Sequence, residues 1–409
     1  MRHHARVTPN RDAPRRAQIK HALTRVARAP GVRASFNAFA LTRLIIFSLF
    51  VLTAKLEVTQ PNQPGDNRAA RLSLHRTAFS HILSARASVG DCTWYMTIAA
   101  QGYERRPFST ERQANWAFFP AFPLLLRAAS LATGELQLTG IVISSLCFFL
   151  ALVVLHRLVT AYGFATPDAD RAVFYLAAFP FSYFFSVPMT ESLFLLVTVA
   201  SFYAAKRERW LFAGLLGALA SATRTTGVLL LPALAVLYWE TYRTLRPRLN
   251  FLPLLFVPAG LLAFMWHLHA LTGDAFAFKD ILVMWGRRPV FFLTTLFEYL
   301  GDPMTLAVSW DFRFLSFLAV VGAGVCGFAL VKWRQWSLAA YTLASVFVTL
   351  SSGLLQSQAR YMMVVFPAFL ALAVWGRRPR IDQIIRTTFL ILLVLLTIMF
   401  AYQLDLALA

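Results

Sequence analysis

The chain has 409 residues, of which 58% are hydrophobic and only 14% charged, whereas soluble domains carry about 25% charged residues. Apolar runs close to membrane-spanning length recur from residue 36 to residue 404 without strand-like alternation, which predicts an all-α polytopic membrane protein and argues against an outer-membrane barrel. The net charge of +20 does not indicate nucleic-acid binding, because no binding motif accompanies it and most basic residues lie in the N-terminal tail or between apolar runs.

The N-terminal segment differs from the rest of the chain. Residues 1–35 are rich in Arg, Ala and Pro and lack an apolar core, which predicts a disordered basic cytoplasmic tail rather than a signal peptide. Residues 36–409 are expected to form a single transmembrane domain. Nine Lys and Arg residues precede the first predicted span, 36–54, and this excess places the N-terminus in the cytoplasm. Because Arg greatly outnumbers Lys, a GC-rich bacterial genome and a bacterial plasma (inner) membrane are expected.

Basic clusters between the later apolar runs set the rest of the topology. If all of them are cytoplasmic, an even number of crossings separates each pair, which predicts about 11 transmembrane helices, an external C-terminus and two external segments, 55–137 and 272–310. The run 116–131 is interpreted as a helix in the outer interface, since counting it as a span would invert the clusters that follow. After the first span, the predicted spans are 138–156, 172–187, 191–205, 210–223, 227–240, 251–271, 311–331, 337–352, 361–375 and 387–404.

Two neighbouring predicted spans, 210–223 and 227–240, are unusually short. At 1.5 Å per residue each covers about 20 Å, which is less than the roughly 30 Å of a bilayer core. The turn that joins them, Arg224 to Gly227, should therefore lie below the outer surface and line a cavity rather than face lipid.

The predicted topology places many charged side chains on the outer side. Arginine binds phosphate through two parallel hydrogen bonds and keeps its proton, whereas a carboxylate can accept the proton of an attacking hydroxyl. A set containing both predicts group transfer from a phosphorylated lipid at the outer face. Its members are Asp91, Glu191, Arg224, Asp274, Lys279, Asp280, Arg287, Arg288 and Arg360.

Each of these residues also has a purely structural interpretation. Asp91 would cap the helix that begins near Thr93, and Arg224 would form an ion pair with Glu191. The remaining alternatives are lipid-headgroup contacts for Arg287 and Arg288, and a helix-end anchor for Arg360 with Tyr361.

The surroundings of Asp91 favour a reaction without a metal ion. Gly90 precedes it and Thr93 stands two positions on, so there is no paired-aspartate motif, and one carboxylate is a poor site for a divalent ion. We therefore expect no cofactor; the alternative is a divalent ion whose site is completed by a distant acid such as Glu191.

Four segments, in order, resemble one family. The segment GDCTWYMTIAAQGY at 90–103, followed by NWAFFPAFPLLLRAAS, is similar to the D-x-x-W-Y-x-x-I-A-x-x-G-Y and F-F-P-x-x-P-L-L signature of the PIG-V-like mannosyltransferases and their bacterial relatives. The later segments MTESLF with ATRTTG, TGDAFAF with MWGR, and ARYMMVVFPAF resemble further family motifs. The resemblance covers about residues 88 to 375, and Gly90 departs from it where the family usually has Trp.

The resemblance implies a membrane glycosyltransferase of the GT-C class, in which the catalytic Asp lies in the first external loop and the donor is a polyprenyl-phosphate sugar. Asp91 is then the general base of an inverting transfer, and Arg224 and Arg360 bind the donor phosphate. The acceptor is a glycolipid, a glycan or a protein, and the sugar is mannose or another hexose. The pocket residues are predicted to be Trp94, Tyr95, Tyr103, Glu191, Lys279, Trp285 and Arg287.

Two other functions agree with the same outer charges. A transporter or flippase for a lipid-linked sugar needs a similar set of arginines and aromatic residues, although no matched pair of broken helices in the two halves of the sequence points to one. A lipid-linked glycan polymerase or ligase would differ only in its acceptor.

Overall fold

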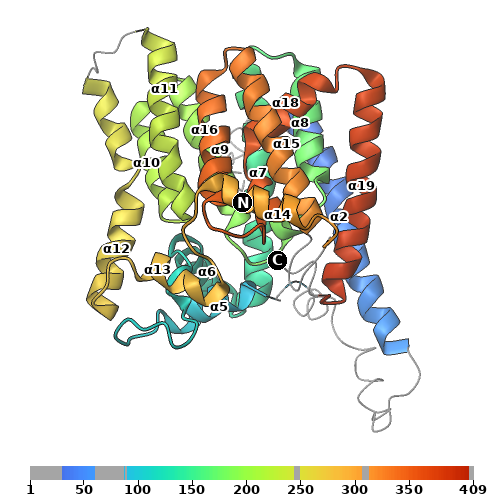
Figure 1. Cartoon of the computed structure of the whole chain (residues 1–409). Coiled ribbons are helices and arrows are strands. Elements are labelled where there is room, and N and C mark those ends of the chain that lie inside the picture. Colours follow the sequence, from blue (N-terminus) through green and yellow to red (C-terminus); the bar gives the residue numbers. More distant parts are fainter. Residues whose placement is uncertain (1–29, 60–86, 88–89, 244–248, 306–312, 405–409) are drawn as a thin grey trace, which may run out of the picture.

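A computed structural model of the chain describes residues 30–59, 87, 90–243, 249–305 and 313–404, and every regular element in these ranges is a helix (Figure 1). The predicted all-α fold is therefore confirmed. Helices satisfy all backbone hydrogen bonds within one segment, which suits apolar sequence that must pack where water is absent. Residues 1–29 of the predicted tail lie outside the described residues.

The first helix, α2, is longer than predicted. It runs over Pro30–Thr59 rather than 36–54, so the prediction that residues 30–35 belong to a disordered tail is wrong. Proline fits the first turn of a helix, where its missing N–H is not needed. Gly31 then brings the helix close to α7 (Leu136–Ala161), because a Cβ there would lie 2.4 Å from Nδ1 of His156.

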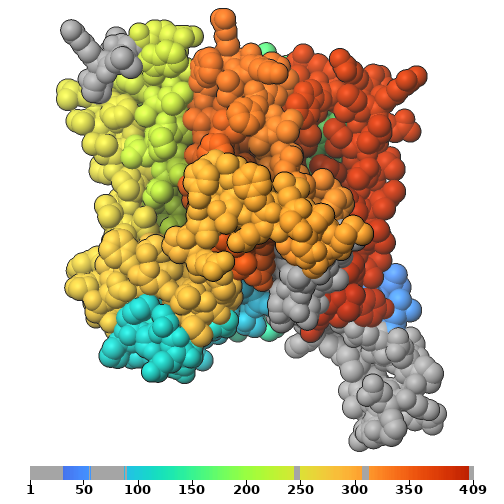
Figure 2. Space-filling view, in the orientation of Figure 1, coloured from blue at the N-terminus to red at the C-terminus, as the bar shows by residue number. Residues whose placement is uncertain are grey.

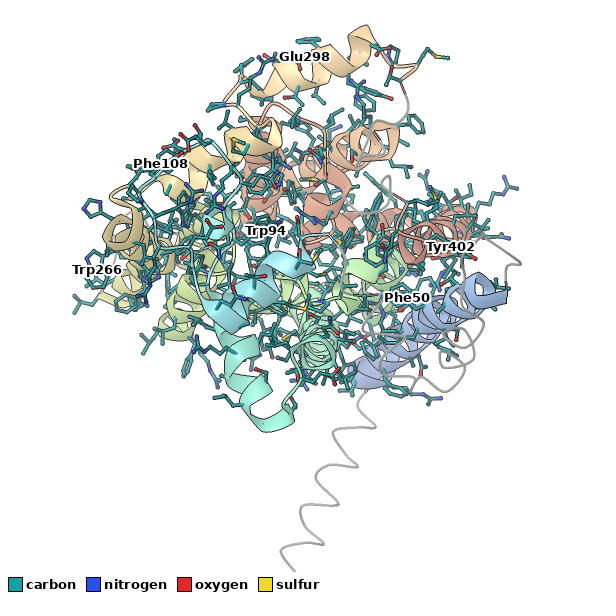
Figure 3. All side chains as sticks on the ribbon, turned by 90° about the horizontal axis from the view of Figure 1, so that it is seen from below. Phe50, Trp94, Phe108, Trp266, Glu298 and Tyr402 are labelled. Atoms are coloured by element: carbon teal, nitrogen blue, oxygen red, sulfur yellow. The ribbon has the colours of Figure 1, made fainter. Side chains whose placement is uncertain are left out.

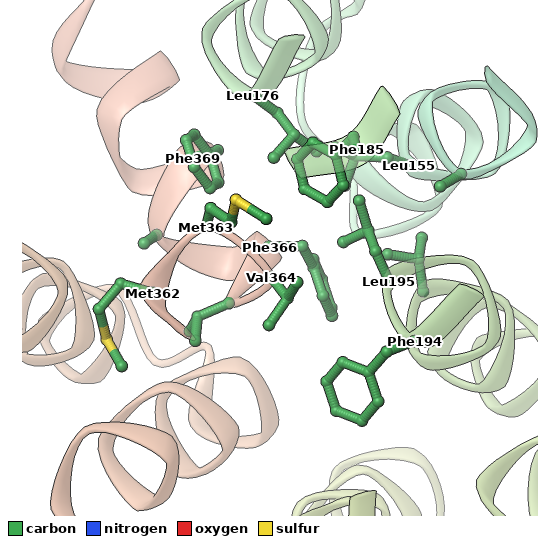
Figure 4. Close-up of a cluster of buried hydrophobic side chains, with 14 of the residues drawn as sticks. Leu155, Leu176, Phe185, Phe194, Leu195, Met362, Met363, Val364, Phe366 and Phe369 are labelled. Atoms are coloured by element: carbon green, nitrogen blue, oxygen red, sulfur yellow. The ribbon is translucent and has the colours of Figure 1, made fainter. Parts of the chain in front are cut away.

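The centre of the bundle is formed by α9 (Glu191–Lys206), which packs along α7 on one side and α10 (Trp210–Ser221) on another. Its side chains are buried almost all round, so it is the core helix. Figure 4 shows the apolar cluster beside it, in which α7, α8 (Thr166–Ala178), α9 and the chain around α18 (Phe366–Trp375) meet. Its labelled members are Leu155, Leu176, Phe185, Phe194, Leu195, Met362, Met363, Val364, Phe366 and Phe369.

Three predicted spans, 172–187, 251–271 and 361–375, were expected to be continuous helices, and each is broken in two. Proline explains the breaks: Pro180 and Pro258 lie between the pieces, and Pro367 lies in the first turn of the second piece. The pieces are α8 and η2 (Ser182–Ser186), η4 (Leu249–Phe256) and α12 (Ala259–Thr272), and α17 (Gln358–Met362) and α18.

The two short helices are present as predicted. They are α10, with 12 residues, and α11 (Leu230–Tyr242), with 13, joined through η3 (Thr225–Leu229). Glycine lets α10 pack closely on η4, since a Cβ at Gly214 would lie 1.9 Å from the carbonyl oxygen of Pro253.

Among the described residues, five helices are long and apolar enough to cross a membrane. The predicted total of about 11 crossings, which includes shorter helices, stays a prediction. These five are Gly31–Ala54, Leu136–Ala161, Leu249–Thr272, Arg313–Lys332 and Pro379–Ala401. The last two correspond to α15 (Arg313–Lys332) and α19 (Pro379–Ala401), and α16 (Trp336–Leu350) lies between them in sequence.

Elements of the two predicted external segments gather at one end of the bundle, the lower end in Figure 1. Helix α14 (Phe292–Gly301), which belongs to the second segment, lies higher and crosses the front of the bundle in Figure 2. An apolar cluster containing Trp116, Phe119, Phe264 and Phe278 ties the two segments together. The run 116–131 is not one helix, because α6 begins only after Pro120. The remaining elements at this end are α5 (Cys92–Gln101), η1 (Asn115–Ala117), α6 (Ala121–Thr133), α13 (Ala277–Asp280) and η5 (Ile281–Trp285).

The basic clusters meet at the other end. Arg171 and Arg377 both bind Asp168 there, and Lys206, Arg243 and Arg334 line one cavity. The chain thus separates its basic helix ends from the elements of the two external segments, as the charge pattern predicted.

Candidate active site

The first pair of the site joins Glu191 and Arg224. Glu191 is the first residue of α9, where the helix dipole favours a carboxylate, and its Oε1 lies 2.9 Å from Nη1 of Arg224. Arg224 follows α10 in an extended conformation, and the turn closes tightly because a Cβ at Gly227 would lie 2.4 Å from backbone atoms of Ala220 and Ser221. The ion pair that was predicted as the structural alternative is therefore present.

Arg360 connects this pair to Asp91. Its Nη2 lies 2.7 Å from Oδ2 of Asp91, and its Nε lies 3.5 Å from Oε1 of Glu191. Asp91 stands at the start of α5, but its side chain makes no capping hydrogen bond. The interpretation of Asp91 as only a helix cap is thus wrong, and the carboxylate is held instead by an arginine from α17.

The four residues Asp91, Glu191, Arg224 and Arg360, which we call the outer network, differ in access to solvent. The side chain of Asp91 is 30% exposed, whereas those of Glu191 and Arg360 are 3% and 8% exposed. Two buried atoms, Oε2 of Glu191 and Nε of Arg360, have no hydrogen-bond partner among the residues that the structure describes. Buried polar atoms are rarely left unbonded, so the outer network has hydrogen-bonding positions that the described part of the chain does not fill.

Tyr361, which was not predicted as a pocket residue, lies among three arginines. Nη2 of Arg287 donates a hydrogen bond to its hydroxyl at 3.0 Å, and the guanidinium groups of Arg224 and Arg360 lie 5.0 and 5.6 Å from its ring centre. A ring face attracts cations and so holds like charges close together. Two signals in the sequence could have identified Tyr361: its place next to Arg360 and its position in the ARYMMVVFPAF segment that resembles a family motif.

Aromatic side chains of both external segments pack beside the outer network. Trp94 stacks on Phe118 at 5.5 Å between ring centres, and Trp285 meets both rings edge-on at 6.1 Å. Figure 3 looks at this end and shows Trp94 near its middle. Phe118 was not predicted as a pocket residue, although it is the first residue of the segment that resembles F-F-P-x-x-P-L-L.

Tyr95 ties α5 to the start of α9. Its hydroxyl lies 3.3 Å from Oγ1 of Thr190, the residue before Glu191. Burial, together with the charge of Glu191, raises the pKa of Tyr95, so the phenol stays protonated.

Two predicted pocket residues lie elsewhere. Lys279 is exposed and pairs with Asp280 at 2.5 Å. The hydroxyl of Tyr103 donates to the carbonyl oxygen of Phe118 at 2.6 Å and its ring packs on Phe264, so Tyr103 fixes the backbone of Phe118. Neither contacts the outer network among the residues that the structure describes.

Arg43 is a buried charge that the sequence reasoning missed. It lies in α2 and donates to the carbonyl oxygen of Ser182 at 2.9 Å and to Oγ of Ser186 at 2.7 Å. These bonds hold η2, the segment that leads to Glu191. A charged residue inside a predicted span was the signal that could have identified it.

Two further features of the site are the backbone conformation of Gly90 and the grouping of possible metal ligands. The φ angle of Gly90 is 59°, a left-handed conformation that glycine adopts more easily than Trp, which fits its departure from the family pattern. Within the described ranges, no three His, Cys, Asp or Glu side chains are grouped as metal ligands would be. The metal-independent mechanism stays a prediction.

Comparison with solved structures finds similarity to the oligosaccharyltransferase of Archaeoglobus fulgidus. Its apo form is 13% identical with a TM-score of 0.45, the form tethered to an acceptor peptide 14% with 0.43, and the complex with an inhibitory peptide and dolichol-phosphate 13% with 0.42. Each alignment covers 91% of this chain and 55% of the archaeal chain. The present chain thus spans about half the length of that enzyme.

Comparison with curated proteins gives no match. The sequence pattern of the family described as mannosyltransferase (PIG-V) matches residues 36–281, which is more than half of the chain and includes Asp91, Glu191 and Arg224. The predicted resemblance is confirmed: this integral membrane protein belongs to the mannosyltransferase (PIG-V) family.

Proposed function

We propose that the protein transfers a hexose from a polyprenyl-phosphate donor to an acceptor hydroxyl on the extracytoplasmic face of a bacterial plasma membrane, with inversion at the anomeric carbon. One observation carries this proposal: Asp91, partly exposed, is bound by Arg360 beside the Glu191–Arg224 pair. Family membership supports sugar transfer as the reaction class.

Asp91 acts as the general base. The acceptor hydroxyl approaches the exposed carboxylate and gives it a proton while its oxygen bonds to the anomeric carbon. The bond from that carbon to the phosphate oxygen breaks on the opposite face, and polyprenyl phosphate leaves with the bonding electrons. With 30% of its side chain exposed, Asp91 is open to such a hydroxyl.

Arg224 and Arg360 stabilise the charge that develops on the leaving phosphate. In the structure, Arg360 is bound to Asp91, so the donor phosphate takes the place of this carboxylate as its partner. Glu191, whose Oε1 lies 3.5 Å from Nε of Arg360, balances the charge of this arginine after Asp91 is released. Donor binding therefore frees Asp91 to accept a proton.

The aromatic wall of Trp94, Phe118 and Trp285 supplies flat apolar surface for the sugar ring. The lipid tail lies along α10, which exposes an apolar face and runs toward Arg224. Four of its side chains are between 40% and 58% exposed: Leu211, Phe212, Leu215 and Leu219.

The test uses purified full-length protein with labelled polyprenyl-phosphate mannose or glucose and a panel of glycolipid, glycan and peptide acceptors. We expect release of polyprenyl phosphate together with a labelled product. Asp91→Asn should lower the rate by roughly 10²- to 10⁴-fold, the usual contribution of a general base.

Asp280→Asn is the matched control, because Asp280 is an exposed carboxylate of the external segments that pairs only with Lys279 among the described residues. It should keep the wild-type rate. Near wild-type turnover in Asp91→Asn would refute the assigned base, and movement of intact donor across a membrane without sugar transfer would indicate a flippase instead.

A further inference from the structure

A cavity of about 430 Å³ lies at the end of the bundle away from Asp91. Helix α9 shows the separation, because Glu191 begins it and Lys206 ends it, about 22 Å apart along the axis. The cavity is formed by the ends of α7, α9 and α11 and by the turn between α15 and α16. Its lining residues are Tyr162, Lys206, Glu240, Arg243, Arg334, Gln335 and Trp336.

The cavity has more positive charge than the protein balances. Its one carboxylate, Glu240, accepts hydrogen bonds from the backbone N–H and the hydroxyl of Ser337, at 3.2 and 2.6 Å. Within the described residues, Lys206, Arg243 and Arg334 have no carboxylate within ion-pair distance. Lys206 instead lies 4.6 Å from the ring centre of Tyr162. Three cations and one carboxylate give a net charge of +2.

Backbone geometry distinguishes two of these three cations. Arg243 and Arg334 have φ angles of 52° and 58°, in the left-handed region that favours glycine at helix ends. The surrounding structure must hold a non-glycine residue in this conformation, and such a residue supports a hypothesis of function. A helix dipole favours one cation at each C-terminus, but here the cations of three helix ends converge on one cavity.

We propose that this cavity binds the phosphate headgroup of an anionic phospholipid on the membrane side opposite the outer network. Lys206, Arg243 and Arg334 would contact the phosphate oxygens. The cavity also contains Tyr162 and Trp336, and Trp336 is 39% exposed; such residues favour the membrane–water interface.

The surface of α15 indicates a lipid rather than a free phosphate. This helix leads directly into Arg334, and apolar side chains on one of its faces are 38% to 59% exposed, as an acyl chain would require. They follow helical spacing: Leu318, Val321, Val325 and Phe328.

The test measures thermal unfolding of the full-length protein in detergent during titration with phosphatidylglycerol, with phosphatidylcholine of the same chains, or with inorganic phosphate. We expect phosphatidylglycerol to raise the unfolding temperature by several degrees and the other two to have little effect. The double variant Lys206→Gln, Arg334→Asn should lose at least half of that rise. Asn tolerates the left-handed backbone at 334.

Arg157→Gln with Lys332→Gln is the matched control, because both residues are exposed at the same end and neither lines the cavity. It removes the same charge and should keep the rise. If the first double variant does not fold, the single variant Arg243→Asn replaces it. An equal loss in both double variants, or an equal response to phosphatidylcholine, would overturn the proposal. A full response to inorganic phosphate would replace the lipid by a soluble phosphate ligand.

Discussion

Two clusters of arginines and carboxylates lie at opposite ends of the bundle, and they differ in how fully their atoms are bonded. The carboxylate of Asp168 accepts hydrogen bonds from Nη2 of Arg377, at 2.7 Å, and from Nη2 of Arg171, at 2.5 Å. The Nε of Arg377 donates a third hydrogen bond to it. The hydrogen bond to Asp168 raises the pKa of Arg377. In the outer network, Oε2 of Glu191 and Nε of Arg360 are buried and have no hydrogen-bond partner within the described ranges.

This difference distinguishes a cluster whose bonds hold helices together from one whose unfilled hydrogen-bonding positions suit the proposed donor site. A fully bonded buried carboxylate stabilises the elements that it joins, here α8 and the turn before α19. A cluster with unpaired buried atoms costs folding free energy, and it is stabilised most when a ligand supplies the missing hydrogen-bond partners. Variants at the two ends should therefore change different measured quantities.

The largest expected effect is on catalysis at the outer network. Arg224→Gln should lower kcat for sugar transfer by about 10²- to 10³-fold, because the proposed mechanism uses this cation to stabilise the leaving phosphate. Arg288→Gln is the control, since Arg288 is 72% exposed at the same end and pairs with Glu298 at 3.7 Å. Equal losses in both variants would show that general charge, rather than the outer network, drives the rate.

The next effect is on stability at the opposite end. Asp168→Asn should lower the free energy of unfolding by about 3 kcal/mol, since removing the carboxylate leaves the charges of its arginine partners uncompensated. The loss should lie at the low end of the usual range because Arg377 is half-exposed and water can solvate it. The transfer rate of the folded fraction should stay at the wild-type level.

Asp170→Asn is the matched control for that stability measurement. Asp170 lies on the same helix, but it is 47% exposed and pairs only with His156 among the described residues, so the loss should stay below about 1 kcal/mol. A loss of activity without a loss of stability in Asp168→Asn would remove the distinction between the two ends.

The smallest effect tests whether Tyr361 belongs to the outer network. Tyr361→Phe removes the hydroxyl that accepts from Arg287 and should slow transfer roughly 2- to 10-fold, which corresponds to one hydrogen bond of about 0.5–1.5 kcal/mol. A double-mutant cycle with Arg287→Gln measures the coupling. Strictly additive effects would mean that the two residues act separately.

The sequence predicted the fold and part of the site because both depend on patterns that are local in the chain. Apolar runs predicted the helices, and basic clusters predicted that one end of the bundle is positive. This topology placed Glu191, Arg224 and Arg360 on the same side of the membrane, and in the structure the three side chains are in contact. Continuous helices at 172–187, 251–271 and 361–375 were wrong, because hydropathy does not register a proline that breaks an apolar run.

Contacts between distant segments were harder to predict. The Asp91–Arg360 bond joins residues that are 269 positions apart, and a helix-start position suggested a cap for Asp91 that the side chain does not form. Tyr361 and Phe118 carry no charge, so charge counting could not find them. Arg43 was detectable as a charge within a span, but its role depends on the carbonyl and hydroxyl groups of η2, whose fold no local pattern predicted.

The contact at Gly227 has a consequence for how the site meets its substrate. Because the backbone there lies directly on the end of α10, the turn has no room to move inward, and Arg224 takes its position as the protein folds. In the proposed mechanism, a phosphate-binding cation that is placed in advance loses no conformational freedom when the donor arrives. An added methyl group at this position would make Arg224 a residue that must be ordered in every catalytic cycle, and turnover would fall although every charged group remained.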